Sequence, residues 1–204
     1  DVCSSDLLLR RTGNDRDLGH LLLNLGAQAK ATGNWPLAAQ RYGESEAAYR
    51  RAGDTTGRAF AMNNRAEILL DQGRLEAADV EIDEARRIFR AAGHGLGAAA
   101  TASTLGTIRA RQHRHDEARR WLDESSQALS AAGFEILVLD AALRQAENEL
   151  LDGDDGAAAS ALAKARTLAA SLGDTGGLDL WLDRLEAVAD ARRAEASWEG
   201  RVRS

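Results

Sequence analysis

The stretch that decides the fold is GNWPLAAQRYGESEAAYRRAGDTTGRAFAMNNRAEILLDQG, residues 33–73, which begins and ends on glycine forty residues apart. The same spacing continues in two series, in which a single member is not glycine: Gly53, Gly93, Gly133 and Gly173, and Gly33, Gly73, His113 and Gly153. Two further series hold small residues: Ala38, Ala78, Ala118 and Ala158, and Gly26, Ala66, Gly106 and Ala146. The chain is therefore built on an internal repeat of forty residues.

Each repeat is predicted to form two helices. Apolar residues follow helical spacing between the glycines, as in Leu18-Leu21-Leu22-Leu25. A glycine supplies the left-handed residue that ends each helix, and Asn34 and Asp154 are suited to cap the start of the next one. Because His113 replaces a glycine, the third turn is predicted to be either strained or built without a left-handed residue.

The small residues predict close crossings between the two helices of a pair. Gly or Ala on one helix and Ala on its partner let the backbones approach, and larger apolar residues fill the adjacent layer. Those larger residues are Tyr42, Ile82, Leu122 and Leu162.

The pattern predicts an all-α fold, a right-handed αα-superhelix of four helix pairs and a C-terminal closing helix. The units are predicted at 16–55, 56–95, 96–135 and 136–175, the closing helix at 177–194, and a frayed polar tail at 195–204. Residues 1–15 are predicted to be a non-native or disordered segment, because the helical pattern starts only after them.

The composition excludes several classes of protein. The chain has 204 residues, a formal net charge of −6 and 44% hydrophobic residues, values that are typical of globular proteins. Acidic and basic residues are interleaved, which disfavours nucleic-acid binding. No apolar run approaches the roughly 20 residues of a membrane helix. We therefore expect a soluble, cytoplasmic protein that binds neither nucleic acid nor membrane.

The N-terminal end has two unusual features. Residues 1–7, DVCSSDL, resemble translated sequencing adapter, and the alternative is a disordered polar terminus. Cys3, the single cysteine, is expected to have no redox or metal function. The first helix is apolar on more than one side, through Leu18, Leu21, Leu22, Leu23 and Leu25. An end unit normally has a polar outer face, so this helix is expected to have lost a preceding partner and to allow self-association.

The units resemble the tetratricopeptide repeat in its lengthened form. The residues that carry this resemblance are Asn24-Leu25-Gly26, Gly33-Asn34-Trp35, Ala38, Tyr42 and, in the next unit, Ala85. The resemblance covers about residues 16–193 and is weaker in the fourth unit, where Gln145 and Asp155 replace a leucine and an aromatic residue. A narrower resemblance, through residues 49–54, 63–67 and 71–75, is to the C-terminal repeat arrays of large bacterial ATPase, cyclase or transcriptional regulators.

The resemblance implies where a ligand would bind. In such arrays the first helix of every unit lines a concave face that holds extended segments. The residues at the lining positions are Asn24, Asn63, Asn64, Glu67, Asp71, Ser103, Thr107, Arg111, Arg144 and Glu147. Asn24, Asn64, Thr104 and Arg144 share one recurring position, and an asparagine there resembles a ladder that hydrogen-bonds a peptide backbone. The alternative is a merely solvated helical face.

Other chemistry has little support. His113 and His115 form the one cluster of metal-capable side chains, without the three or four converging ligands that zinc needs. The sequence contains no phosphate-binding Gly-Lys-Ser/Thr loop and no Gly-x-Ser-x-Gly motif. We expect no metal, no cofactor and no enzymatic activity.

Two functions remain open at this point. The first is a protein or peptide interaction module, a sensor or scaffold segment of a larger bacterial regulatory protein. The second is an intramolecular structural arm that restrains a neighbouring ATPase, cyclase or DNA-binding domain and has no ligand of its own.

Overall fold

The described residues form helices and contain no strand. The computed structural model describes residues 9, 11 and 13–202. In chain order the main helices are α2 (Asp15–Ala31), α3 (Trp35–Arg51), α4 (Thr55–Asp71), α5 (Leu75–Ala91), α6 (Gly95–Arg111), α7 (His115–Ala131), α8 (Glu135–Asp152), α9 (Asp155–Leu172) and α10 (Leu178–Val202). The predicted all-α fold is confirmed for this part of the chain.

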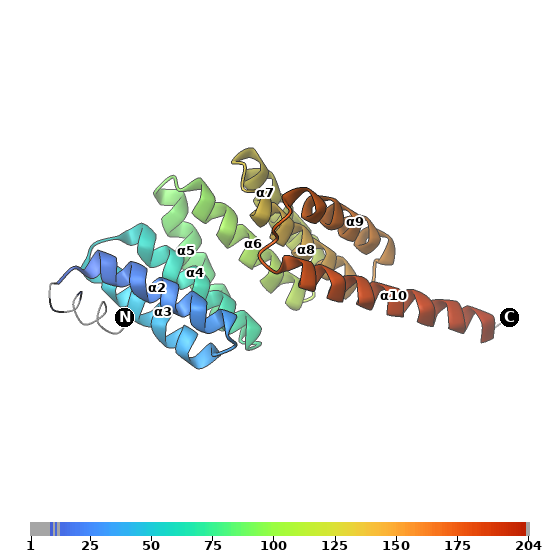
Figure 1. Cartoon of the computed structure of the whole chain (residues 1–204), viewed down its shortest axis with the longest axis horizontal. Helices are drawn as coiled ribbons and strands as arrows, with labels where there is room; N and C mark the ends of the chain where they lie inside the picture. Colours follow the sequence, from blue (N-terminus) through green and yellow to red (C-terminus); the bar gives the residue numbers. More distant parts are fainter. Residues whose placement is uncertain (1–8, 10, 12, 203–204) are drawn as a thin grey trace. The chain divides into compact units, whose positions relative to one another are not determined.

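Two compact parts make up the chain, one ending at Thr104 and the other starting at Leu105, within α6. In the N-terminal part, α2 packs against α3, α3 against α4, and α4 against α5. In the C-terminal part, α7 packs against α8, α8 against α9, and α10 against both α8 and α9 (Figure 1). Within each part, therefore, helices that follow one another in sequence are neighbours in space.

The turns between helices follow the glycine series. Positive φ angles occur at Gly33, Gly53, Gly73, Gly93, Gly133, Gly153 and Gly173. His113 occupies the same position with φ of 59°, so the third turn keeps the left-handed geometry and carries its strain on a side-chain-bearing residue. The predicted caps are confirmed, because Asn34 Oδ1 accepts from Leu37 N at 3.3 Å and Asp154 Oδ1 from Ala157 N at 2.9 Å.

The close helix crossings are confirmed by the space around two glycines. A Cβ atom added to Gly26 would lie 2.5 Å from Tyr42 Cε1, and one added to Gly106 would lie 2.6 Å from Leu122 Cγ. Both distances are far below van der Waals contact, and Tyr42 and Leu122 are themselves buried. The small residue in each pair therefore makes room for the large apolar side chain of its partner helix.

The C-terminal end differs from the prediction. We expected a helix over 177–194 and a frayed tail over 195–204, whereas α10 continues without interruption from Leu178 to Val202. Residues 195–202 contain no proline, and their one glycine is too weak a signal to end a helix alone. The segment at residues 1–7 that resembles adapter lies outside the described residues. No helix in the described part of the chain is long and apolar enough to cross a membrane.

Candidate peptide-binding face

The first helix of each pair carries a polar face, which we call the first-helix face. On α2 and α4 this face holds Asn24, which is exposed, and Asn64, which is half-buried. Within the described residues, neither side-chain amide takes part in a hydrogen bond. Asn24 and Asn64 occupy the same repeat position, and α2 contacts α4. The N-terminal part therefore presents two equivalent amides on neighbouring helices, each with a donor and an acceptor to offer.

The two other members of this position are bonded inside the protein. The Thr104 hydroxyl donates to Asn63 Oδ1 at 3.3 Å and to the Ala100 carbonyl at 3.3 Å. Arg144 donates through Nε to Asp140 Oδ2 at 2.7 Å and through Nη1 to Thr107 Oγ1 at 3.0 Å. The predicted four-membered ladder is thus divided into two available amides and two residues that already have partners.

Ion pairs connect successive first helices. In the N-terminal part, Lys30 Nζ lies 2.5 Å from Glu67 Oε2 and joins α2 to α4. In the C-terminal part, Arg111 Nη2 lies 2.9 Å from Glu147 Oε1 and joins α6 to α8. Sequence reasoning missed Lys30, which lies one turn from the positions that the family pattern marks. In both pairs a basic residue near the end of one first helix reaches an acidic residue of the next.

Three predicted contact residues lie below the surface. Asn63, Ser103 and Thr107 are between 5% and 7% exposed, whereas Asp71 is exposed at the C-terminal end of α4. The sequence pattern predicted that all four residues lie on one polar face. In the structure, the side chains of Asn63, Ser103 and Thr107 point into the interface between helices and are buried. We therefore leave Asn63, Ser103 and Thr107 out of the contact set proposed below.

An aromatic residue was also missed on this face. The Arg144 guanidinium lies 5.9 Å from the ring centroid of Trp181 on α10. A cation over an indole face at this distance is attracted to it. Arg144 is therefore held by Asp140, Thr107 and Trp181 together, which leaves its guanidinium committed to intramolecular contacts.

Three charged residues on α3, α4 and α5 form what we call the ion triad: Glu46, Arg65 and Glu81. Arg65 Nη1 lies 2.8 Å from Glu46 Oε2, and its Nη2 lies 2.5 Å from Glu81 Oε1, so this guanidinium joins α3, α4 and α5. Arg58 also donates to Glu46 at 3.2 Å. Burial by itself would raise the pKa of Glu46, but the charges and hydrogen bonds of Arg65 and Arg58 outweigh it and hold that pKa below its usual value.

A second charged cluster lies in the C-terminal part. Arg119 on α7 donates to Glu149 and Asp152 on α8, and these two bonds raise the pKa of its guanidinium. It also donates to Asp116 on its own helix. His115 Nδ1 lies 3.0 Å from Asn148 Oδ1. Among the described residues, no group of three His, Cys, Asp or Glu side chains is placed to hold one metal ion. The cluster joins α7 to α8.

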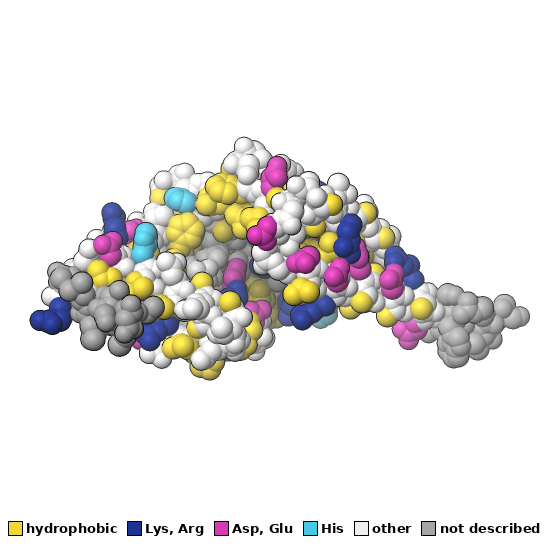
Figure 2. Space-filling model, viewed as in Figure 1, with side chains coloured by type: hydrophobic (Ala, Val, Ile, Leu, Met, Phe, Trp, Pro, Cys, Tyr) yellow, Lys and Arg dark blue, Asp and Glu magenta, His cyan; other side chains and the backbone are white. Residues whose placement is uncertain are grey.

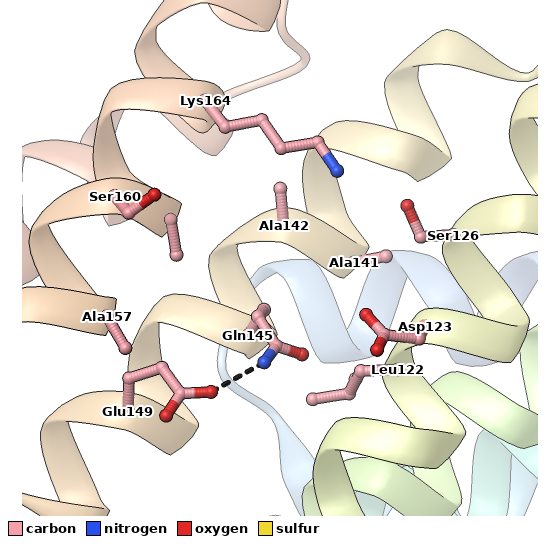
Figure 3. Close-up of a pocket in the computed structure, with 11 residues that line it drawn as sticks. Leu122, Asp123, Ser126, Ala141, Ala142, Gln145, Glu149, Ala157, Ser160 and Lys164 are labelled. Carbon is pink, nitrogen blue, oxygen red and sulfur yellow. Dashed lines mark hydrogen bonds between the residues drawn. The ribbon is translucent and has the colours of Figure 1, made fainter. Parts of the chain in front are cut away.

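A cavity of about 280 Å³ opens among α7, α8 and α9 (Figure 3). Apolar residues form part of its wall, among them Leu122 and Ala141, and polar side chains face it from all three helices. Gln145 Nε2 donates to Glu149 Oε1 at 2.6 Å across its wall. Sequence reasoning did not predict this cavity. The sequence feature that could have indicated it is the small size of the fourth unit's residues at several positions where earlier units carry larger ones, such as Ala161 at the position of Glu81 and Trp121.

Surface charge follows the interleaved pattern of the sequence. Figure 2 shows acidic and basic side chains interspersed along α9 and α10 on the visible face of the C-terminal part, without a large patch of one sign. A nucleic-acid surface would need clustered basic residues. In this view, the C-terminal part offers no such cluster.

The comparison with known families agrees with this geometry. Residues 57–131 match the family model of the tetratricopeptide repeat. The consecutive packed helices on both sides of the matched region fit the same kind of helical repeat array. Tetratricopeptide repeats generally mediate protein–protein interaction and form a scaffold without catalytic chemistry of its own. No curated protein matches the chain.

Proposed function

We propose that this array binds an extended segment of a partner protein on the first-helix face of α2 and α4. The observation that carries the proposal is the pair of equivalent amides, Asn24 and Asn64, without hydrogen-bond partners in the described part of the chain. An amide can donate to a peptide carbonyl and accept from a peptide N–H at the same time. Packed helices are about 8–10 Å apart, which corresponds to roughly three residues of an extended peptide.

The neighbouring charges add to this surface. Asp71 and the Lys30–Glu67 pair lie on the same first helices as the two amides. Charged groups of both signs therefore lie beside the amides, with Lys30 and Glu67 already paired with each other. In the C-terminal part, Arg111, Arg144 and Glu147 extend the face but are held by intramolecular bonds.

In this proposal the chain is a non-enzymatic sensor or scaffold segment of a larger bacterial regulatory protein. The support is the resemblance of residues 49–54, 63–67 and 71–75 to the repeat arrays of such regulators. Self-association through α2 is part of the same proposal, because Leu21, Leu23 and Leu25 are only half-buried.

The second candidate is a structural arm without a ligand. It is favoured by the C-terminal part, where Arg111 with Glu147 and Arg144 with Thr107 bond the first helices to one another. Such bonds stiffen an array and need no partner. The two candidates differ in whether the Asn24 and Asn64 amides contact another protein.

A peptide-display experiment separates them. Random 12-residue peptides are selected on the intact chain, and the selected peptides are titrated against wild type, Asn24→Ala and Asn64→Ala. Each substitution removes hydrogen bonds worth about 0.5–1.5 kcal/mol, so affinity is expected to fall roughly 2- to 10-fold. Gln127→Ala, an exposed amide on α7, is the matched control and is expected to have no effect. Full affinity in both asparagine variants, with unchanged melting, would favour the structural arm.

A further inference from the structure

The cavity among α7, α8 and α9 occupies the repeat position of the ion triad. Moving forward two repeats of forty residues from the triad gives Ser126, Gln145 and Ala161, and all three line the cavity. Each replacement is shorter than the residue at its counterpart, and the guanidinium that joins three helices in the N-terminal part has no equivalent here. The cavity therefore lies at the repeat positions that hold the side chains of the ion triad in the N-terminal part.

The walls of this space retain hydrogen-bond acceptors. Gln145 Oε1 is buried and has no hydrogen-bond partner among the described residues. Asp123 faces the cavity from α7 and Glu149 from α8 (Figure 3). A buried acceptor without a donor is costly and is normally satisfied by a bound group or water. A donor that enters the cavity would pair with Asp123, and it would reach Gln145 Oε1 after a rotation of that buried side chain.

The remaining surface suits an aliphatic chain that ends in a flat cation. Ala141, Ala142 and Ala157 offer methyl groups along which methylenes can pack. A guanidinium carries five donors in one plane and is weakly hydrated, whereas an ammonium is strongly hydrated. Lys164 lies at the opposite end of the cavity from Asp123 and Glu149 (Figure 3), where it can donate to a carbonyl. An arginine residue in a peptide has this arrangement, with its guanidinium at one end and backbone carbonyls at the other.

We propose that the cavity among α7, α8 and α9 is a binding site for an arginine side chain of a partner protein. The inserted guanidinium would take the place that the Arg65 guanidinium has in the ion triad. Its donors would meet the Asp123 carboxylate and, once the Gln145 side chain rotates, Gln145 Oε1, and the adjacent backbone carbonyl would accept from Lys164. This site lies in the C-terminal part and does not depend on the first-helix face proposed above.

The test uses capped peptides Gly-Gly-Arg-Gly-Gly, Gly-Gly-Lys-Gly-Gly and Gly-Gly-Leu-Gly-Gly, titrated into the intact ¹⁵N-labelled chain and followed by NMR. The arginine peptide is expected to bind saturably and at least about fivefold more tightly than the other two, with a shift of the Gln145 side-chain amide. Binding is expected to weaken with added salt, since both partners are charged. Equal affinity of the three peptides would overturn the proposal.

Three variants locate the binding. Ala161→Trp fills the cavity with the side chain that Trp121 places at the same repeat position, and it should abolish binding. Asp123→Asn should weaken binding at least threefold, while Glu124→Gln, the same charge change at the next residue and outside the cavity wall, should not. Asp123 is exposed, so its variant remains informative even where Ala161→Trp alters melting. Unchanged affinity in Asp123→Asn would contradict the proposal.

Two further titrations separate a partner protein from a small molecule and the cavity from the first-helix face. Free L-arginine should bind more weakly than the capped peptide, because its ammonium adds positive charge near Lys164. If it binds ten times more tightly, the site serves a small molecule and the partner assignment is wrong. The Asn64→Ala variant should bind the arginine peptide normally, and a loss there would show that the signal comes from the first-helix face.

Discussion

Replacing Arg65 with glutamine tests the ion triad most sharply, because glutamine is the residue that the fourth unit carries at this position. The substitution leaves Glu81 without this partner and Glu46 with fewer donors. Removing one partner of a buried pair costs about 3–5 kcal/mol. Glu46 keeps Arg58 at 3.2 Å and the Arg65 side chain is 26% exposed, so we expect a smaller loss of about 2–3 kcal/mol.

Urea denaturation followed by circular dichroism measures this loss, and pH supplies an internal check. The pKa of Glu46 is lowered in the folded protein. Its ion pairs therefore stabilise the fold above the ordinary glutamate pKa of about 4.3, and this stabilisation is lost as pH falls through the lower folded value. The Arg65→Gln penalty should accordingly be full at pH 7 and shrink below about pH 4.

The control for this prediction is Arg87→Gln. Arg87 pairs with Glu84 three residues away on the same helix, and its side chain is 71% exposed. Exposed pairs of this kind are worth about 0.2–1 kcal/mol at most. Equal penalties for the two variants, or an Arg65→Gln penalty that stays constant from pH 7 to pH 3, would refute the assignment of the triad as a partly buried, charge-dependent junction.

Three other substitutions test the turns and crossings by thermal and urea denaturation. His113→Gly should stabilise the protein by about 0.5–1 kcal/mol, because relief of left-handed strain exceeds the added freedom of the unfolded chain; a lower melting temperature would contradict this. Gly26→Ala should destabilise by about 1–3 kcal/mol, since the new Cβ meets the buried Tyr42 ring. Gly43→Ala, within α3 and with its nearest contact at 3.9 Å, should instead stabilise by about 0.5–1 kcal/mol. The same sign for both glycine variants would show that the crossings are not closely packed.

The sequence predicted those features that depend on backbone geometry repeated at a fixed period. Gly33 and Gly153 are needed because the turn there has a positive φ angle, and Gly26 is needed because a larger side chain would collide with Tyr42 of the partner helix. Both requirements can be derived from residue type and spacing. The exception at His113 could also be predicted, because the two alternatives, a strained left-handed residue or a turn without one, differ in a single φ angle.

The bonding of the polar side chains could not be predicted in the same way. Lys30 reaches Glu67 and Arg144 reaches Thr107 across 37 residues, which is three residues short of the repeat. That offset depends on side-chain rotamers and on the tilt between neighbouring helices, and neither can be derived from the forty-residue spacing. For the same reason, the sequence pattern predicted that Asn63 and Thr107 line the exposed first-helix face, whereas both side chains are buried. The cavity was missed because it arises from several small residues in three helices acting together.

Direct contact of Asn24 and Asn64 with the partner segment is the central claim. The measurement that tests it is an NMR titration of the intact ¹⁵N-labelled chain with a display-selected peptide, observing the side-chain amides. We expect the Asn24 and Asn64 side-chain resonances to shift together with one dissociation constant, while that of Gln127 stays unchanged. Saturable binding that leaves both asparagine resonances in place and shifts residues of α3 and α5 instead would contradict the claim.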